Sequence, residues 1–248
     1  MLSRSTIFTT LHKGASTFIA DELGRYLLTT GYYDDFRPVG ALRLKGRDMA
    51  DMGDWPDEGL VGVRVYPAEL RKLYEEHPDF SAFIDNAALV FVQRDPRDTA
   101  VSLFYSKAYS HTTNVLNHEK FVQERERLQS MSTLDGVKEF TAKVGVGEFR
   151  GLHRMHKVHG GIMTSYEDLV TNPAGWFETV GEYIGWPDEF IETVTQKFAH
   201  SFDPPDAADP LQHKRRITPG NWTEVFDDEL IDHFDAEIGD LLRANGYS

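Results

Sequence analysis

The chain has 248 residues, of which 40% are apolar and 27% charged, as expected for a globular protein with one substantial core. Its 40 acidic and 26 basic residues give a net charge of −14, which argues against nucleic acid as a general partner because a phosphate backbone needs a basic surface. Cysteine is absent, so disulfides, thiolate nucleophiles and zinc–thiolate sites are excluded.

The distribution of apolar residues predicts no membrane segment. The amino-terminal residues contain no apolar run long enough for a signal peptide, and no later stretch approaches the length of a membrane span. We therefore expect a cytoplasmic protein with no membrane partner, folded as a single domain over residues 1–248.

The first predicted elements are a strand, a tight turn and a helix in direct succession. Thr6 to Thr10 are mostly β-branched or aromatic, and the helical pattern begins at Ser16, a good N-cap type. Between them, Lys13 stands beside the small residues Gly14 and Ala15. A lysine and a helix start can together bind a phosphate or sulfate. An ordinary strand-to-helix connection is the alternative.

Two further strands are predicted before residue 94. Residues 29–38 have the composition of a loop, and 39–60 that of a polar surface excursion. Residues 60–66 are typical of a strand ended by Pro67, after which a short helix to residue 76 would bury Leu70, Leu73 and Tyr74. Residues 87–93 are continuously apolar, as is usual for a parallel strand covered on both faces.

Arg94 and Ser102 flank the next predicted turn and helix start. Arg94 ends the buried strand, at the edge where open α/β sheets bind ligands, and a helix is expected from Asp98 or Thr99. Arginine offers a planar fork for phosphate and serine one more donor. Alternatively, Arg94 pairs with Asp95 or Asp98 and only ties the turn together.

The rest of the chain is predicted to be mainly helical. Residues 111–160 are helical with an interruption at Gly145–Gly147, and a strand is expected over 160–166. Further helices are predicted at 174–184, at 189–200 and at the C-terminus, the last burying the apolar residues Leu230, Phe234, Ile238, Leu241 and Leu242. Strands alternating with helices predict an α/β fold with a largely parallel sheet.

Two clusters of ionisable residues remain. Lys214, Arg215 and Arg216 form the densest positive charge in an acidic chain, which favours an anion clamp over a solvated basic turn. His153, His156 and His159 are spaced by three, which suggests a metal site. Because no carboxylate cluster accompanies them, we favour a solvated helix end and expect no metal.

Four stretches, in order, resemble motifs of the cytosolic sulfotransferases. Residues 12–18 (HKGASTF) are similar to the 5′-phosphosulfate loop, and residues 93–105 to the 3′-phosphate motif. Residues 165–173 resemble the family's Tyr-Glu-Asp-Leu segment, and 215–222 its last Arg-containing loop. The resemblance implies a P-loop-like three-layer α/β/α fold. It also implies transfer of a sulfuryl group from 3′-phosphoadenosine 5′-phosphosulfate (PAPS), leaving 3′-phosphoadenosine 5′-phosphate (PAP).

The resemblance also implies roles for individual residues. Lys13 would offset charge on the leaving phosphate, with Gly14, Ala15, Ser16 and Thr17 completing the loop and Phe18 in place of a tryptophan that packs on adenine. The 3′-phosphate would be held by four residues, namely Arg94, Ser102, Arg215 and Arg216. Tyr166 would lie near the adenine, and Phe202 would supply a second stacking ring.

The general base departs from the family pattern. The family has it in a Lys-Thr-His-x-Pro segment, which corresponds here to Arg64-Val-Tyr66-Pro67. Tyrosine is a poor base near neutral pH unless its pKa is lowered. His12, Tyr66 and a carboxylate at Asp34 or Asp35 therefore stay open as candidates.

Three functions remain in competition at this point. The first is a PAPS-dependent sulfotransferase with a small or medium hydroxyl acceptor, because an acidic surface should repel polyanions. The second is a P-loop nucleotide kinase, although its Gly-x-x-x-x-Gly-Lys motif is missing. The third is a catalytically inactive protein that binds PAP or PAPS. The sequence does not indicate an oligomeric state.

Overall fold

The computed structural model describes residues 2–39, 54–111, 118–203 and 217–247. They group into two compact units, one of Met1–Gln93 with Gly151–Ser201 and the other of Arg94–Arg150 with Phe202–Ser248. The single domain over residues 1–248 stays a prediction.

The first unit is built on a five-stranded sheet with the order β2-β3-β1-β4-β5, in which every pairing is parallel. The strands are β1 (Thr6–Thr10), β2 (Asp35–Pro38), β3 (Leu60–Val65), β4 (Ala88–Gln93) and β5 (Ile162–Ser165). The central strands β1 and β4 are buried along their whole length, because helices cover both faces. The predicted α/β fold with a parallel sheet is confirmed.

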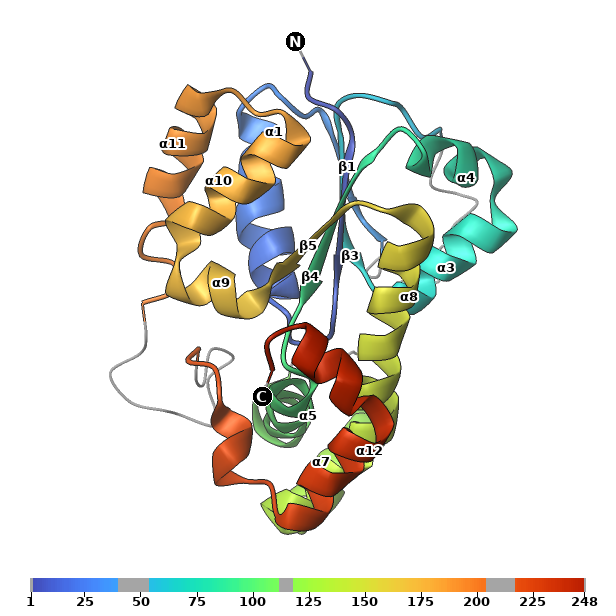
Figure 1. Ribbon diagram of the computed structural model, residues 1–248, viewed down its shortest axis with the longest axis vertical. Coiled ribbons are helices and arrows are strands. Elements are labelled where there is room, and N and C mark those ends of the chain that lie inside the picture. Colours follow the sequence, from blue (N-terminus) through green and yellow to red (C-terminus); the bar gives the residue numbers. More distant parts are fainter. Residues whose placement is uncertain (1, 40–53, 112–117, 204–216, 248) are drawn as a thin grey trace. The chain divides into compact units, whose positions relative to one another are not determined.

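Helices lie on both sides of this sheet (Figure 1). On one side are η1 (Phe18–Gly24), a π-helix, then α1 (Arg25–Thr29), α9 (Tyr166–Thr171), α10 (Pro173–Ile184) and α11 (Asp188–Phe198). On the other are α3 (Pro67–Glu76), α4 (Pro78–Ile84) and α8 (Phe149–His159). This is the three-layer arrangement that the resemblance implies.

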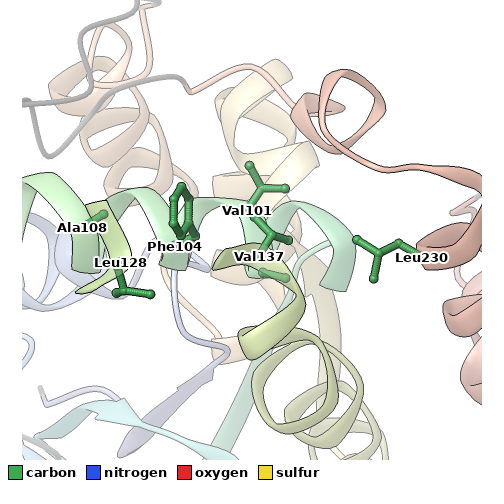
Figure 2. Close-up of a cluster of buried hydrophobic side chains, with 7 residues drawn as sticks. Val101, Phe104, Ala108, Leu128, Val137 and Leu230 are labelled. Atoms are coloured by element: carbon green, nitrogen blue, oxygen red, sulfur yellow. The ribbon is translucent and has the colours of Figure 1, made fainter. Parts of the chain in front are cut away.

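The second unit consists of helices around a separate core. They are α5 (Pro96–Tyr105), η3 (Ser106–Ser110), α6 (His118–Gln129), α7 (Thr133–Phe140), η5 (Thr141–Glu148), η6 (Asn221–Glu224) and α12 (Asp228–Ala244). Figure 2 shows Val101 and Phe104 of α5 among the buried side chains of Leu128, Val137 and Leu230. Each such side chain stabilises the fold by roughly 1.5–3 kcal/mol when fully buried. The core therefore fixes α5 through its apolar face.

Two predicted loops are regular structure instead. Asp35–Pro38, predicted as part of a loop, forms the edge strand β2, whose four side chains are only half-buried and so lack an apolar pattern. Gly145 and Gly147 do not interrupt the helices but lie inside η5. A Cβ on Gly145 would lie 2.8 Å from the Phe234 ring, so a close approach of α12 requires the glycine.

Some predicted burial and boundaries also differ. Tyr74 is 38% exposed and Leu241 half-buried, whereas Leu70 and Leu73 are buried as predicted. α5 starts at Pro96, earlier than predicted, because the Asp95 side chain accepts a bond from the Arg97 amide and caps the helix. Within the described ranges, no helix has both the length and the apolar character needed to cross a membrane.

Candidate functional site

The sequence motifs follow strands that end at one edge of the sheet. Thr10 of β1 pairs with Val92 of β4, and Gln93 of β4 pairs with Ser165 of β5. Thr9 of β1 pairs with Val65, the last residue of β3. The segments after these strands therefore start from the carboxyl edge, which is where open parallel sheets bind their ligands.

The turn after β1 has an unusual backbone. Lys13 and Ala15 have φ values of 63° and 61°, a left-handed conformation that costs a residue with a Cβ about 1–2 kcal/mol. Gly14 lies between them and donates its N–H to Leu11 O at 3.1 Å. A Cβ on Gly14 would lie 3.2 Å from that oxygen and 3.5 Å from Val92 O. The turn is therefore pressed closely onto β1 and β4.

The helix after this turn begins at Ser16. Ser16 is therefore the first helical residue and not the N-cap that precedes the helix. The Ile19 amide donates to Ala15 O at 2.9 Å, which places Ser16 and Thr17 in the first helical turn. Amide N–H groups of a first turn point out of the helix start, where they attract anions. The structure thus places half-buried Lys13 and the two hydroxyls at a helix start, and a role for this turn as an anion cradle stays a prediction.

Phe18 lies deeper than the rest of the loop. It is 4% exposed, and its ring meets Phe198 of α11 edge-on at 5.2 Å. Phe198 also stacks on Phe177 of α10 at 5.9 Å. These contacts anchor the first helix to α10 and α11, so Phe18 has a packing role in this unit.

Two of the three candidate bases lie together. The rings of His12 and Tyr66 stack with their centroids 4.1 Å apart and their planes 5° from parallel. They come from the segments after the adjacent strands β1 and β3, and both residues are half-buried. Sequence spacing alone does not predict this pairing.

Asp34 and Asp35 lie at the other edge of the sheet. Asp35 pairs with Leu60 at the start of β3, and at about 3.3 Å per residue the length of β3 separates it from Tyr66 by roughly 17 Å or more. Its carboxylate also accepts two bonds from Arg37, at 2.9 and 2.6 Å. The structure does not bring this carboxylate to the loop.

In the second unit, Asp98 connects the start of α5 to a distant part of the chain. Its carboxylate accepts bonds from the amides of Gly220 at 2.7 Å and Trp222 at 2.9 Å. Burial raises the pKa of the Asp98 carboxyl, while the charge of Arg94 and the two amides act against that rise. The Arg94 segment and the last motif thus meet at Asp98. Ser102 is one turn further along α5 and half-buried.

A buried ion pair reinforces this connection. Arg97 bonds the carboxylate of Asp95 through two nitrogens, with a shortest distance of 2.8 Å, and both side chains are under 10% exposed. The Arg97 guanidinium also lies 3.8 Å from the centre of the Trp222 ring. Arg97 therefore pairs with Asp95, a pairing that was not considered from the sequence. Sequence inspection missed this role, although the Arg–Asp alternation and the tryptophan were its signals.

The remaining predicted nucleotide contacts are distributed between the units. Tyr166 is the first residue of α9 and is buried, and Ser165 before it caps that helix through the Asp168 amide at 2.9 Å. Phe202, in the second unit, is half-buried in the turn after α11. Arg215 and Arg216 lie outside the described residues.

The three histidines of α8 have separate surroundings. His156 faces the Phe91 ring at 5.4 Å, and His159 meets the Tyr74 ring at 4.4 Å. Burial, and secondarily the charge of His156, lowers the pKa of His153 to about 4. Among the described residues no group of three or more His, Asp or Glu side chains could hold a metal ion.

Taken together, these features define an α/β protein with a strained, lysine-containing turn at the carboxyl edge of a parallel sheet. A family model for the sulfotransferase domain matches residues 77–246, more than half of the chain. The chain belongs to the sulfotransferase family, and the prediction of a sulfotransferase is confirmed. No curated protein matches the sequence.

Solved structures support the same fold at low sequence identity. The mouse sulfotransferase SULT7A1 in complex with PAP is similar with a TM-score of 0.61 and 14% identity, over 97% of this chain and 85% of that one. Retinol dehydratase in complex with retinol and PAP is similar with a TM-score of 0.51 and 17% identity, over 98% and 82%. The P-loop-like sulfotransferase fold of this chain is therefore established.

Proposed function

We propose that this protein transfers a sulfuryl group from PAPS to a hydroxyl of a small or medium acceptor. The observation that supports this most directly is the turn after β1, which joins a lysine, two hydroxyls and a helix start. PAP is the ligand in the two solved sulfotransferase-fold structures named above.

In this proposal Lys13 stabilises the leaving group. Sulfuryl transfer needs the donor and acceptor in line and stabilisation of the negative charge that develops on the 5′-phosphate oxygen. The Lys13 ammonium and the first-turn amides of Ser16 and Thr17 supply that stabilisation without a covalent intermediate. Gly14 and Ala15 let the backbone approach the anion closely.

Arg94 and Ser102 bind the 3′-phosphate, with Arg215 and Arg216 as further contacts. The Asp98 bonds to Gly220 and Trp222 support this assignment, because they hold the end of the last motif at the start of α5. Tyr166, Phe202 and Phe18 are proposed to contribute near the adenine. For Phe18 this means an aromatic edge at the ligand, because its ring is already packed on Phe198.

The acceptor is proposed to be uncharged or weakly charged. The net charge of −14 disfavours approach of a polyanion, and retinol, the ligand in one of the similar structures, is a small alcohol. The nucleotide kinase has no support from the family model, whereas an inactive PAP-binding protein differs from the proposal only in turnover. A cytoplasmic location and the absence of a metal requirement stay predictions.

A Lys13→Ala variant tests the proposal. We expect PAP to raise the Tm of the wild-type protein and ATP with magnesium to have no effect. In Lys13→Ala, transfer of label from [³⁵S]PAPS to 2-naphthol should fall at least 100-fold, because charge on the leaving oxygen is no longer offset. Lys72→Ala, at a lysine of α3 whose side chain is 45% exposed and pairs with Glu76, is the matched control.

The 3′-phosphate assignment is tested by comparing PAP with AMP, which lacks that phosphate. Ser102→Ala should weaken PAP binding by about tenfold and leave AMP binding unchanged, since one hydrogen bond to a charged group is lost. A protein that binds PAP but transfers no label to 2-naphthol, simple alcohols or water would support the inactive binder instead.

A further inference from the structure

The stacking of His12 on Tyr66 is a geometry in which one side chain can act as a general base and the other can hold it in place. The two rings lie face to face, with centroids 4.1 Å apart and planes 5° from parallel, so the contact covers a face of the imidazole. Proton transfer uses the ring nitrogens, which lie at its edge. A stacked histidine can therefore be held in one orientation and still exchange a proton.

An irregularity in β3 places Tyr66 in this pair. Ile7 pairs with Gly62 and Thr9 with Val65, so β3 uses three residues where β1 uses two. Arg64 lies in this bulge with φ of 55° and forms an ion pair with Asp21 of η1 at 2.6 Å. A bulge next to a site re-aims the side chains that follow it. Tyr66 follows directly.

The backbone of Tyr66 is fixed on its other side as well. Tyr66 is the N-cap of α3, and its carbonyl accepts the Leu70 amide at 2.9 Å. Its side chain makes no capping bond to the helix. The backbone of Tyr66 is thus held by β3 and α3, and its phenol ring packs on the ring of His12.

The residues with a strained backbone lie close to His12 and Tyr66 in the sequence. Lys13, Ala15 and Arg64 are the non-glycine residues with positive φ in the described part of the chain. Two follow His12 within three positions, and the third precedes Tyr66 by two. Left-handed residues of this kind persist where the surrounding structure forces them, commonly at functional sites.

The chemistry of the two side chains differs in a way that assigns their roles. Near neutral pH an imidazole accepts and releases protons readily, whereas a phenol, with an ordinary pKa of about 10, is almost entirely protonated. The face of a tyrosine ring also attracts a cation, such as the imidazolium formed by proton uptake. His12 suits the base, and Tyr66 suits its support.

We propose that His12 is the general base of the reaction and that Tyr66 is the positioning residue that holds its ring; this rests on the sulfuryl transfer proposed above. The acceptor oxygen forms a bond to sulfur while the bond from sulfur to the bridging 5′-phosphate oxygen breaks. That electron pair stays on PAP, next to Lys13. The acceptor proton moves to a ring nitrogen of His12, which later releases it to solvent.

Variants at the two positions separate these roles. With [³⁵S]PAPS and 2-naphthol, or water where the naphthol is not sulfated, His12→Gln should lower kcat about 100-fold or more with little change in the PAPS KM. The rise of kcat/KM with pH across the imidazole range should disappear. Tyr66→Ala should lower kcat about tenfold, and Tyr66→Phe should restore it to within about threefold, because the support needs the ring and not the hydroxyl.

Several charged groups on the neighbouring elements bear on that pH profile, namely Lys13, Asp21, Glu22, Arg64 and Glu69. The profile is therefore compared with that of His118→Gln, which changes an exposed histidine of α6 and should retain the wild-type curve. PAP-induced Tm shifts within about 2 °C of wild type show that the variants still bind the nucleotide.

The proposal is overturned if His12→Gln keeps the pH-dependent rise and more than half of kcat. It is equally overturned if Tyr66→Phe loses as much activity as His12→Gln, since the phenol itself would then be the base. A wild-type protein that neither binds PAP nor transfers label rejects the proposed function, which is a distinct result from an active wild type with an active His12→Gln.

Discussion

The turns that follow β1 and β4 are built in opposite ways. After β1, residues 12–15 are half-buried apart from Gly14 and include two left-handed non-glycine residues. After β4, the turn at Arg94–Asp98 is buried throughout, and its Asp95 and Arg97 form a close ion pair. One turn has a strained backbone on both sides of Gly14, whereas the other pairs its buried Asp95 carboxylate with Arg97 and bonds its Asp98 carboxylate to two backbone amides.

The proposed function gives a reason for this difference between the two turns. The phosphosulfate end changes charge during transfer, so its turn needs accessible donors and a base held in place. The 3′-phosphate is only bound and released, so a rigid frame around Arg94 is sufficient. Under the proposed function, the strained turn is the one at which bonds would change.

Breaking the buried frame should have the largest effect. Arg97→Ala leaves the Asp95 carboxylate buried without its ion pair and removes the cation from the Trp222 ring, so the free energy of unfolding should fall by about 3–5 kcal/mol. Urea unfolding followed by tryptophan fluorescence measures it. Arg127→Ala, at an exposed ion pair of α6, should cost less than about 1 kcal/mol. Similar losses in both variants would contradict the comparison.

Lowering the pH should reduce the stability of the first unit through His153, which lies outside both turns. His153 has its pKa lowered from 6.5 to about 4 by burial, so the folded state keeps it neutral while the unfolded state takes up a proton below pH 6.5. Stability should therefore fall by about 1–2 kcal/mol between pH 6.5 and 4, a value discounted because the imidazole is only half-buried.

A His153→Leu variant tests this origin of the pH dependence. Its stability should decline less over the same range, while His159, whose pKa burial also lowers, leaves a smaller decline in the same direction. Equal slopes in His153→Leu and wild type, measured by urea unfolding at pH 7 and pH 5, would assign the effect elsewhere. His118→Gln serves again as the exposed control.

Local patterns in the sequence were sufficient for most of the sheet. The buried strands β1, β3, β4 and β5 are β-branched or apolar runs, and the turn after β1 is visible from its small residues and lysine. The edge strand β2 was not predictable in this way, because Asp35–Pro38 is polar, short and only half-buried. Its strand character comes from pairing with β3.

The contacts that organise the sites depend on tertiary structure. Asp98 bonds to residues more than 120 positions away, and Tyr66 reaches His12 only because β3 has a bulge. Neither the composition nor the spacing of residues in the sequence predicts these long-range contacts. The sequence therefore identified the residue types of the turn after β1, whereas the stacking of His12 on Tyr66 required the structure.

The smallest expected effect tests whether the loop after β1 is strained. Ala15→Gly removes a Cβ from a residue with φ of 61°, so it should stabilise the protein by about 0.5–1 kcal/mol after the greater chain entropy of the unfolded glycine is included. Ala68→Gly, on the exposed start of α3, should instead destabilise by about 0.5–1 kcal/mol. Because a looser turn is less preorganised, Ala15→Gly should also bind PAP about two- to threefold more weakly in calorimetry. Loss of stability in both variants would show that the loop is not strained, and the contrast between the two turns would then rest on the buried ion pair alone.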